Sequence, residues 1–119
     1  MSKCSVLLVE DEPLLQMMWE DLADVLQIDI TGLEDSVEGA LKRAEDLQFS
    51  VAVLDVNLTD GHVGPVASRL NDLGIPYIVT SGNGPDLEND FPNVPILRKP
   101  FSVAQMVRAM EDLCASGAK

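Results

Sequence analysis

Residues 50–56 spell Ser-Val-Ala-Val-Leu-Asp-Val, and after the first residue only Asp55 interrupts the apolar run. Strands that are apolar on both faces are typical of the centre of a parallel sheet, where helices cover each side. Ligands of such sheets bind beyond the carboxyl ends of the strands. The run therefore predicts a buried central strand whose one charged residue lies where a binding site is expected.

The residues on either side of this run alternate between strand and helix patterns. Further strands are predicted at about 5–10, at the short Ile28–Thr31, at Pro76–Thr80 and at about Val94–Arg98. Helices are predicted from Pro13 to about residue 27, from Asp35 to about Leu47, from about Val63 to Leu73, and from Ser102 onward. Since consecutive parallel strands need a crossover helix, this alternation indicates a parallel α/β sheet.

Local signals refine the predicted helices. In the first, apolar residues recur at helical spacing, at Leu14, Leu15, Met18, Leu22, Val25 and Leu26. Asp35 with Glu38 resembles a capping box at the start of the second helix, and Gly74 should end the third. Residues 86–93 hold only two large apolar groups, so any helix there should be short or mobile.

Composition limits the classes of function. The chain has 119 residues, which suffices for one domain, residues 1–119, and leaves no room for an output domain. No apolar stretch approaches the roughly 20 residues of a membrane helix, and the first residues lack a signal-peptide core. The formal net charge of −12 disfavours nucleic-acid binding, because a polyanion would be repelled. We expect a soluble, cytoplasmic monomer whose partners are proteins or small phosphoryl donors.

The cysteines and the histidine carry little functional signal. Cys4 and Cys114 lie at opposite ends of the chain, outside any CxxC or Cys/His cluster, so thiolate metal binding is not expected. Both are predicted to be reduced, small hydrophobic residues. His62, the one histidine, follows Asp60-Gly61 and is expected in a solvated loop or a first helical turn.

Polar side chains mark the ends of four predicted strands: Glu10, Asp11, Asp55, Ser81 and Lys99. Glu10, Asp11 and Asp55 would lie at neighbouring strand ends, where like charges repel one another. A cation resolves the repulsion, and an all-oxygen ligand set favours Mg²⁺ over zinc. The three acids therefore predict a magnesium site.

Lys99 and Ser81 extend this site into a pocket for a phosphoryl group. The transferring group spreads charge over its equatorial oxygens. Metal, ammonium and hydroxyl could each meet one oxygen while the Asp55 carboxylate attacks in line. A structural aspartate and a chance Lys-Pro pair are the plain alternative. The equal spacing of Asp11, Asp55 and Lys99 along the chain favours the joint site.

Four motifs carry a resemblance to a known family: Val9-Glu10-Asp11-Glu12, Leu54-Asp55-Val56-Asn57-Leu58 with Asp60-Gly61, Val79-Thr80-Ser81-Gly82, and Arg98-Lys99-Pro100-Phe101. Over its whole length the chain resembles a bacterial response-regulator receiver domain, as a single-domain member. The resemblance implies a doubly wound, flavodoxin-like (βα)5 fold with a five-stranded parallel sheet in the order 2-1-3-4-5. It also implies a signalling module of a two-component or phosphorelay system, not an enzyme.

The resemblance assigns roles to the acids. Glu10, Asp11 and Asp55 would hold Mg²⁺, helped by the main-chain carbonyl of Asn57. Asp55 would be phosphorylated by a sensor histidine kinase or a phosphotransfer protein.

The resemblance also assigns the phosphate contacts. Ser81 stands at the family's hydroxyl position, and Lys99 would contact the phosphate through a cis Lys99-Pro100 bond. Thr80 is the rival hydroxyl. Because side chains alternate along a strand, only one of the two should face the pocket, and Gly82 after Ser81 favours Ser81.

One position departs from the family pattern. Ile96 stands where receivers usually carry an aromatic switch, so a rotating Tyr or Phe cannot relay the signal. The Thr-Ser-Gly and Lys-Pro-Phe-Ser segments resemble the receiver subgroup that lacks this aromatic and has a loose fourth helix. Phosphorylation is then expected to order Gly82–Asn93, and the altered surface near helices four and five would bind a target protein.

Two other classes of function stay open. Asp55-Val56-Asn57-Leu58-Thr59 approximates the DxDxT motif of haloacid-dehalogenase-like phosphohydrolases, although that motif follows a first strand and has an acid where Asn57 stands. The other is a pseudo-receiver, a binding scaffold that is never phosphorylated. Its usual signature is loss of an acid or of the lysine, and neither is lost in this chain.

Overall fold

Five parallel strands form the main sheet of the protein, whose computed structural model describes residues 4–46, 48–82 and 87–117. These strands are β1 (Ser5–Val9), β2 (Asp29–Glu34), β3 (Val51–Asp55), β6 (Tyr77–Ser81) and β7 (Ile96–Arg98). Their order across the sheet is β2-β1-β3-β6-β7, which confirms the predicted doubly wound fold and its strand order. β3 lies at the centre and is buried throughout, as its apolar sequence predicts.

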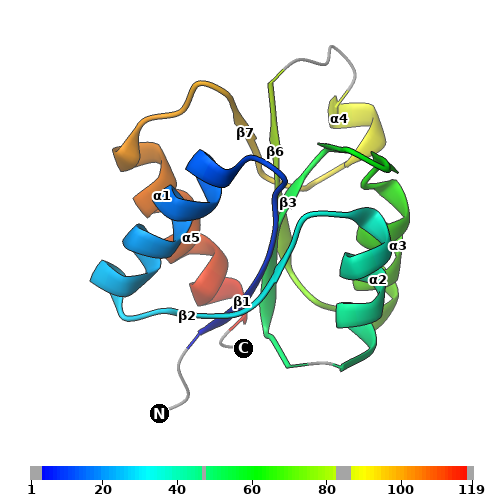
Figure 1. The fold of residues 1–119 in the computed structure, drawn as a ribbon, viewed down its shortest axis with the longest axis horizontal. Helices are drawn as coiled ribbons and strands as arrows, with labels where there is room; N and C mark the ends of the chain where they lie inside the picture. The colour runs from blue at the N-terminus through cyan, green and yellow to red at the C-terminus, as the bar shows by residue number, and fades with distance from the viewer. Residues whose placement is uncertain (1–3, 47, 83–86, 118–119) are drawn as a thin grey trace.

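The helices form one layer on each face of the sheet (Figure 1). One layer consists of α1 (Pro13–Leu26) and α5 (Val103–Gly117), and the other of α2 (Val37–Asp46), α3 (Gly64–Leu73) and the short α4 (Leu87–Asp90). Each face has its own apolar core. Within the part of the chain that the structure describes, no helix has the length and apolarity needed to span a membrane.

Most strand limits differ from the predicted ones by one or two residues, and β6 ends at Ser81 instead of Thr80. β2 extends to Glu34 instead of ending at Thr31, and β7 begins at Ile96 instead of Val94. A small antiparallel hairpin, β4 (Asn57–Leu58) and β5 (Gly61–His62), follows β3 and is absent from the predicted elements. Two-residue strands carry no apolar periodicity, so the sequence pattern does not reveal them.

The predicted apolar face of α1 is wrong for two of its residues. Leu14 is 69% exposed and Val25 is 79% exposed, whereas Trp19, Leu22 and Ala23 are buried. Trp19 packs against Phe101, with ring centroids 5.8 Å apart. Helical spacing gives the width of an apolar stripe, but the bulky indole decides which part of it turns toward the sheet.

The N-terminal cap of α2 also differs from the predicted Asp35–Glu38 box. Ser36 Oγ accepts a hydrogen bond from the Gly39 amide at 3.0 Å. The Asp60 carboxylate, from the turn between β4 and β5, accepts from the Val37 amide at 2.8 Å and from the Glu38 amide at 3.2 Å. A capping group that comes from another element has no sequence signal near the helix it caps.

The prediction of two reduced cysteines is wrong in this structure. Cys4, just before β1, and Cys114, in α5, form a disulfide with their Cα atoms 5.6 Å apart. The two cysteines meet because α5 packs against the same face of the sheet as the start of β1 and runs toward that end of the strand. Distance along the sequence was therefore a poor guide to distance in space.

Candidate functional site

Three carboxylates gather where β1 and β3 end. These strands are neighbours, and Val9 lies level with Leu54. Glu10 and Asp11, which follow β1, therefore lie beside Asp55, the last residue of β3. One carboxylate oxygen from each acid lies within 4.8 Å of the other two. Glu10 is 1% exposed and Asp55 is 5% exposed, so water cannot offset their mutual repulsion. The cluster could hold a divalent cation.

Glu10 and Asp55 lie so close together in a buried environment that a proton or a cation must offset their charge. Burial, followed by a hydrogen bond and charge repulsion from Asp55, raises the pKa of Glu10 from 4.5 to about 8. Glu10 Oε2 accepts from the Glu12 amide at 3.1 Å, whereas Oε1 forms no hydrogen bond with any described residue. Two facing carboxylates must share either a proton or a cation, and Oε1, which accepts no hydrogen bond, offers a ligand position for the cation.

Lys99 reaches this cluster from across the sheet. Its ammonium lies 3.5 Å from Asp55 Oδ2, 3.9 Å from Glu10 Oε1 and 3.5 Å from Glu12 Oε2. Burial by itself would lower the pKa of Lys99, but the carboxylates of Glu10, Asp55 and Glu12 together raise it, so the ammonium stays charged. Its main-chain amide donates to the Ser81 carbonyl at 2.7 Å, and the predicted cis Lys99-Pro100 bond is present.

The hairpin after β3 adds contacts that sequence reasoning missed. Thr59 Oγ1 donates to Asp11 Oδ2 at 3.1 Å, and Gln16 of α1 donates to the Glu10 carbonyl at 2.6 Å. Thr59 ends the DxDxT-like stretch, but nothing in the sequence predicts its contact with Asp11, and Gln16 lies in no motif, because a turn brings the one and the rotation of a helix brings the other to the site. Asn57, whose carbonyl is the expected fourth ligand, begins β4 two residues beyond Asp55.

The two candidate hydroxyls at the end of β6 lie on opposite faces of the sheet. Thr80 is level with Asp55 of β3, and both strands place these residues on the α1/α5 side, to which Ile78 also belongs. Ser81 follows Tyr77 and Val79 on the α2/α3 side and is the last residue of the strand. Thr80 is 0% exposed and Ser81 is 1% exposed.

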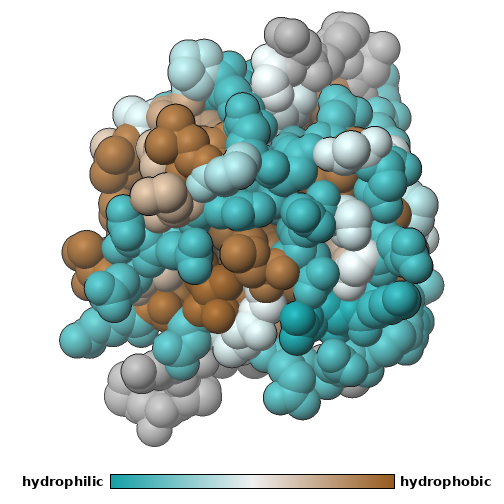
Figure 2. Space-filling model, viewed as in Figure 1, coloured by the Kyte–Doolittle hydropathy of each residue, from teal (hydrophilic) through white to brown (hydrophobic). Residues whose placement is uncertain are grey.

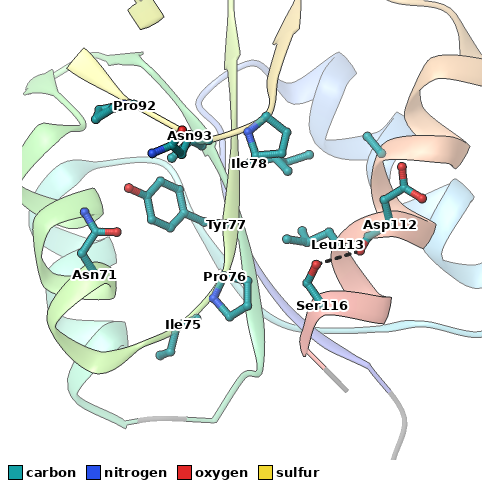
Figure 3. A pocket seen from close by; sticks show the side chains of 13 residues that line it. Asn71, Ile75, Pro76, Tyr77, Ile78, Pro92, Asn93, Asp112, Leu113 and Ser116 are labelled. Atoms are coloured by element: carbon teal, nitrogen blue, oxygen red, sulfur yellow. Dashed lines mark hydrogen bonds between the residues drawn. The ribbon is translucent and has the colours of Figure 1, made fainter. Parts of the chain in front are cut away.

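Cavity size does not single out this edge of the sheet. A cavity of about 540 Å³ lies at the opposite end of β6, with Tyr77 on the α3 side of the strand and Leu113 on the α5 side (Figure 3). None of the clustered acids lines it. A smaller cavity of about 420 Å³ lies beside the cluster and is lined by Lys99, Glu12 and the first turns of α1. The convergence of charged groups marks the site, and the large cavity does not.

His62 has a structural role in the hairpin. It is exposed in β5, as expected for a solvated loop, and its Nδ1 accepts from the Gly64 amide at 2.9 Å. Its ring stacks on Phe91, just after α4, with centroids 5.9 Å apart. This stack joins the segment after Asp55 to the end of α4.

No family model and no curated protein matches the chain. Solved structures do. The chain is 38% identical to SdrG from Sphingomonas melonis Fr1, with 100% of both chains covered and a TM-score of 0.80. Against the BeF3-activated conformation of SdrG, from Pseudomonas melonis Fr1, identity is 40%, coverage is 96% of this chain and 99% of that one, and the TM-score is 0.79.

More distant structures share the fold. A response-regulator receiver protein from Sinorhizobium medicae WSM419 is 23% identical, with 98% of both chains covered and a TM-score of 0.84. The receiver domain of the sensor histidine kinase PA1611 from Pseudomonas aeruginosa PAO1, which has a magnesium ion in its active-site cleft, is 23% identical, with 96% and 99% covered and a TM-score of 0.81. With the full-length match to SdrG, these findings establish that the chain belongs to the response-regulator receiver family.

Proposed function

We propose that the protein is phosphorylated on Asp55 by a histidine kinase or a phosphotransfer protein, in a reaction that requires Mg²⁺, and that it signals through contacts with other proteins. The observation that carries this proposal is the grouping of Glu10, Asp11 and Asp55 opposite the Lys99 ammonium at one edge of the sheet. A carboxylate nucleophile needs nearby positive charge to accept an anionic phosphoryl group.

The residues at this edge fit a magnesium ion. Glu10, Asp11, Asp55 and the main-chain carbonyl of Asn57 would hold it, and all four supply the oxygen ligands that Mg²⁺ prefers. Glu10 Oε1, which is buried and accepts no hydrogen bond from a described residue, supports this assignment, as does the magnesium ion in the related receiver of PA1611. Bound there, the ion would neutralise charge on the acids and on the incoming phosphoryl oxygens.

Asp55, Lys99 and Ser81 would have different roles in phosphoryl transfer. An Asp55 carboxylate oxygen forms the new bond to phosphorus while the bond to the donor's imidazole nitrogen breaks, and the imidazole leaves with that electron pair. The Lys99 ammonium would neutralise one phosphoryl oxygen, and the Ser81 hydroxyl, at the last residue of β6, would donate to another. Both groups come from strands next to or beyond β3, so the pocket is assembled by the sheet order.

The output is proposed to pass through the segment that follows β6. Ile96, at the position of the usual aromatic switch, is half-buried and packs against the α2/α3 core, so it cannot swing like an exposed ring. The segment Gly82–Asn93 includes residues 83–86, which lie outside the described residues. Its described part contains the four-residue α4, whose first residue, Leu87, is buried. Phe91, which follows α4, is buried as well. Ordering of this segment is the proposed response.

Labelling with acetyl phosphate tests the function directly. The wild-type protein, incubated with acetyl phosphate and Mg²⁺, should gain one phosphoryl group by intact mass, and Asp55→Asn should gain none. An exposed carboxylate serves as the matched control, because Glu111→Asn should be labelled like the wild type. Labelling of Asp55→Asn, or full labelling in excess chelator, contradicts the proposal. Absence of labelling in the wild type would favour the pseudo-receiver.

A further inference from the structure

Thr80 carries a buried hydroxyl that the fold leaves without a partner. The residue is 0% exposed, and Oγ1 forms no hydrogen bond with any described residue. Buried polar groups are almost always paired, so an unpaired one calls for a physical reason. Valine has nearly the same shape without this cost, and the sequence nevertheless has threonine at a fully buried position.

The sheet register places this hydroxyl under the phosphoacceptor pocket. β6 lies between β3 and β7, and Thr80 is level with Asp55 on one side and with Leu97 on the other. Lys99 follows β7 and lines a cavity with the first turns of α1, so its side chain lies on the same α1/α5 side. The Lys99 side chain must therefore cross β6 at Thr80 or just beyond it to come within 3.5 Å of Asp55. Thr80 therefore lies on the strand between the two charged groups, level with Asp55.

The contacts of the unphosphorylated site leave room for a further hydrogen-bond donor to the Asp55 carboxylate. All three carboxylate contacts of the Lys99 ammonium are long, at 3.5 to 3.9 Å. The Thr80 hydroxyl donates no hydrogen bond to Asp55, although the two residues are direct neighbours across the sheet. Rotation about the Cα–Cβ bond of Thr80 could bring its hydroxyl toward Asp55, its neighbour on β3.

We propose that Thr80 is a positioning residue of the phosphoacceptor site, whose hydroxyl donates to the Asp55 carboxyl group and holds it in the orientation that attacks phosphorus. This inference rests on the proposed function and deepens it. Ser81 keeps a separate task, because it lies on the other face of the sheet at the rim, where it would meet the phosphoryl oxygens. The two neighbouring hydroxyls would thus serve the nucleophile and the phosphoryl group respectively, which departs from the sequence expectation that only one of them faces the pocket.

Four variants test this role by labelling rate and by thermal stability together. Thr80→Val should be labelled about tenfold more slowly by acetyl phosphate with Mg²⁺, as the loss of one hydrogen bond to a charged group implies. Its melting temperature should stay the same or rise, because the variant no longer buries an unpaired hydroxyl. Thr80→Ser should restore labelling to within about twofold of the wild type. Thr80→Ala is a second hydroxyl-free variant should Thr80→Val fail to fold.

Tyr77→Phe is the matched control, because it removes a hydroxyl from the same strand at the end away from the site (Figure 3). It should be labelled like the wild type. In Thr80→Val the maximal rate should fall while the half-saturating acetyl phosphate concentration and the Mg²⁺-induced rise in melting temperature stay the same. A merely structural threonine would instead lower stability and labelling together, without rescue by serine.

The outcomes separate the two proposals. Normal labelling of the hydroxyl-free variants, or loss of rate that Thr80→Ser does not restore, overturns the role of Thr80 and leaves phosphorylation of Asp55 standing. Failure of the wild type to be labelled overturns the proposed function and this inference with it.

Discussion

At the scale of single residues, Glu10 determines how the metal-free protein responds to pH. Its pKa is raised from 4.5 to about 8, first by burial and then by Asp55. Between pH 4.5 and about pH 8, Glu10 therefore keeps its proton in the folded state, whereas the unfolded state has already lost it. This group's contribution to stability is complete below pH 4.5, declines as pH rises to about 8, and is level above that.

Glu10→Gln should remove this decline. In chelator at pH 8 the variant should be more stable than the wild type by at least about 1 kcal/mol, since one pKa unit corresponds to about that energy. Urea unfolding at intervals from pH 4.5 to 8.5 measures the effect. Glu111→Gln, an exposed acid on α5, is the control and should keep the wild-type pH profile.

Magnesium should reverse the sign of the Glu10 substitution. Binding to the native state alone adds about 2.7 kcal/mol at a hundredfold excess over the dissociation constant. The wild type should gain stability in Mg²⁺ at pH 8, while Glu10→Gln and Asp11→Ala gain less. If Asp11→Ala is stabilised as much as the wild type, the metal does not bind at this cluster.

The residues of the site were the most predictable part of the molecule. Glu10, Asp55 and Lys99 converge as predicted, because parallel strands fix where their last residues lie. Thr59 and Gln16 could not be predicted, since their contacts depend on turn geometry and on helix rotation. The disposition of Thr80 and Ser81 required the sheet register, which alternation alone does not supply.

At the scale of elements, the start of α1 provides an apolar border to the site. Leu14 and Met17 are 69% and 59% exposed, and Leu14 also lines the cavity that Lys99 shares. Figure 2 shows apolar surface on this side of the molecule, over α1. We expect a protein that delivers a phosphoryl group to Asp55 to cover this border, which acetyl phosphate need not do.

Replacing both residues should therefore separate the two donors. Leu14→Ser with Met17→Ser should slow transfer from an autophosphorylated histidine kinase, chosen from a panel by its activity on the wild type, by at least about tenfold, as expected for loss of apolar contacts at an interface. Labelling by acetyl phosphate should be unchanged. Val25→Ser alters a 79% exposed residue at the far end of α1 and should transfer normally. Equal slowing with both donors would indicate damage to the site.

The second element-scale prediction concerns the segment Gly82–Asn93. It contains two glycines and two prolines, and its buried anchors are Leu87 and Phe91. So little buried apolar surface leaves its ordering near balance, and a differential contact energy of about 1–3 kcal/mol would change the populations several-fold. Amide exchange with and without beryllofluoride should show added protection in this segment.

Two variants distinguish the path by which that protection arises. Ser81→Ala should lose most of the added protection, because the hydroxyl would draw the start of the segment toward the phosphoryl group. His62→Ala removes the ring that stacks on Phe91 and should raise exchange around α4 in both states. Equal protection with and without beryllofluoride, and no effect of Ser81→Ala, would exclude ordering as the output.

The type and order of the main elements followed from apolar runs and their spacing, but their ends did not. β2 extends to Glu34 because it pairs with β1 along its whole length, including an irregularity between Val6 and Leu7 that no local pattern encodes. The cap of α2 comes from Asp60, more than one element away. Tertiary contacts fix element boundaries, and these contacts lie outside any sequence window.

At the scale of the whole molecule, the disulfide closes the chain at the edge opposite the phosphoacceptor site. Cys4 precedes β1 and Glu10 follows it, so the length of β1 separates the cross-link from the acids. The bond joins residues that are 110 positions apart, and a cross-link over so long a loop stabilises mainly by restricting the unfolded chain. Persistent disulfides form mainly in oxidising compartments and are rare in the cytosol, so this pairing and the predicted cytoplasmic location point in opposite directions.

Reduction should therefore lower stability without altering the chemistry of Asp55. Dithiothreitol should reduce the free energy of unfolding by about 2–4 kcal/mol, which is typical of a native disulfide. Cys4→Ser and Cys114→Ser should each reproduce that loss and show no further effect of the reductant, while acetyl phosphate labels all forms at the wild-type rate because the site lies at the other end of β1. Thiol titration of the denatured, unreduced protein provides the independent check. Two free thiols, together with a melting temperature that dithiothreitol does not change, would contradict the disulfide and mean that Cys4 and Cys114 lie side by side unbonded.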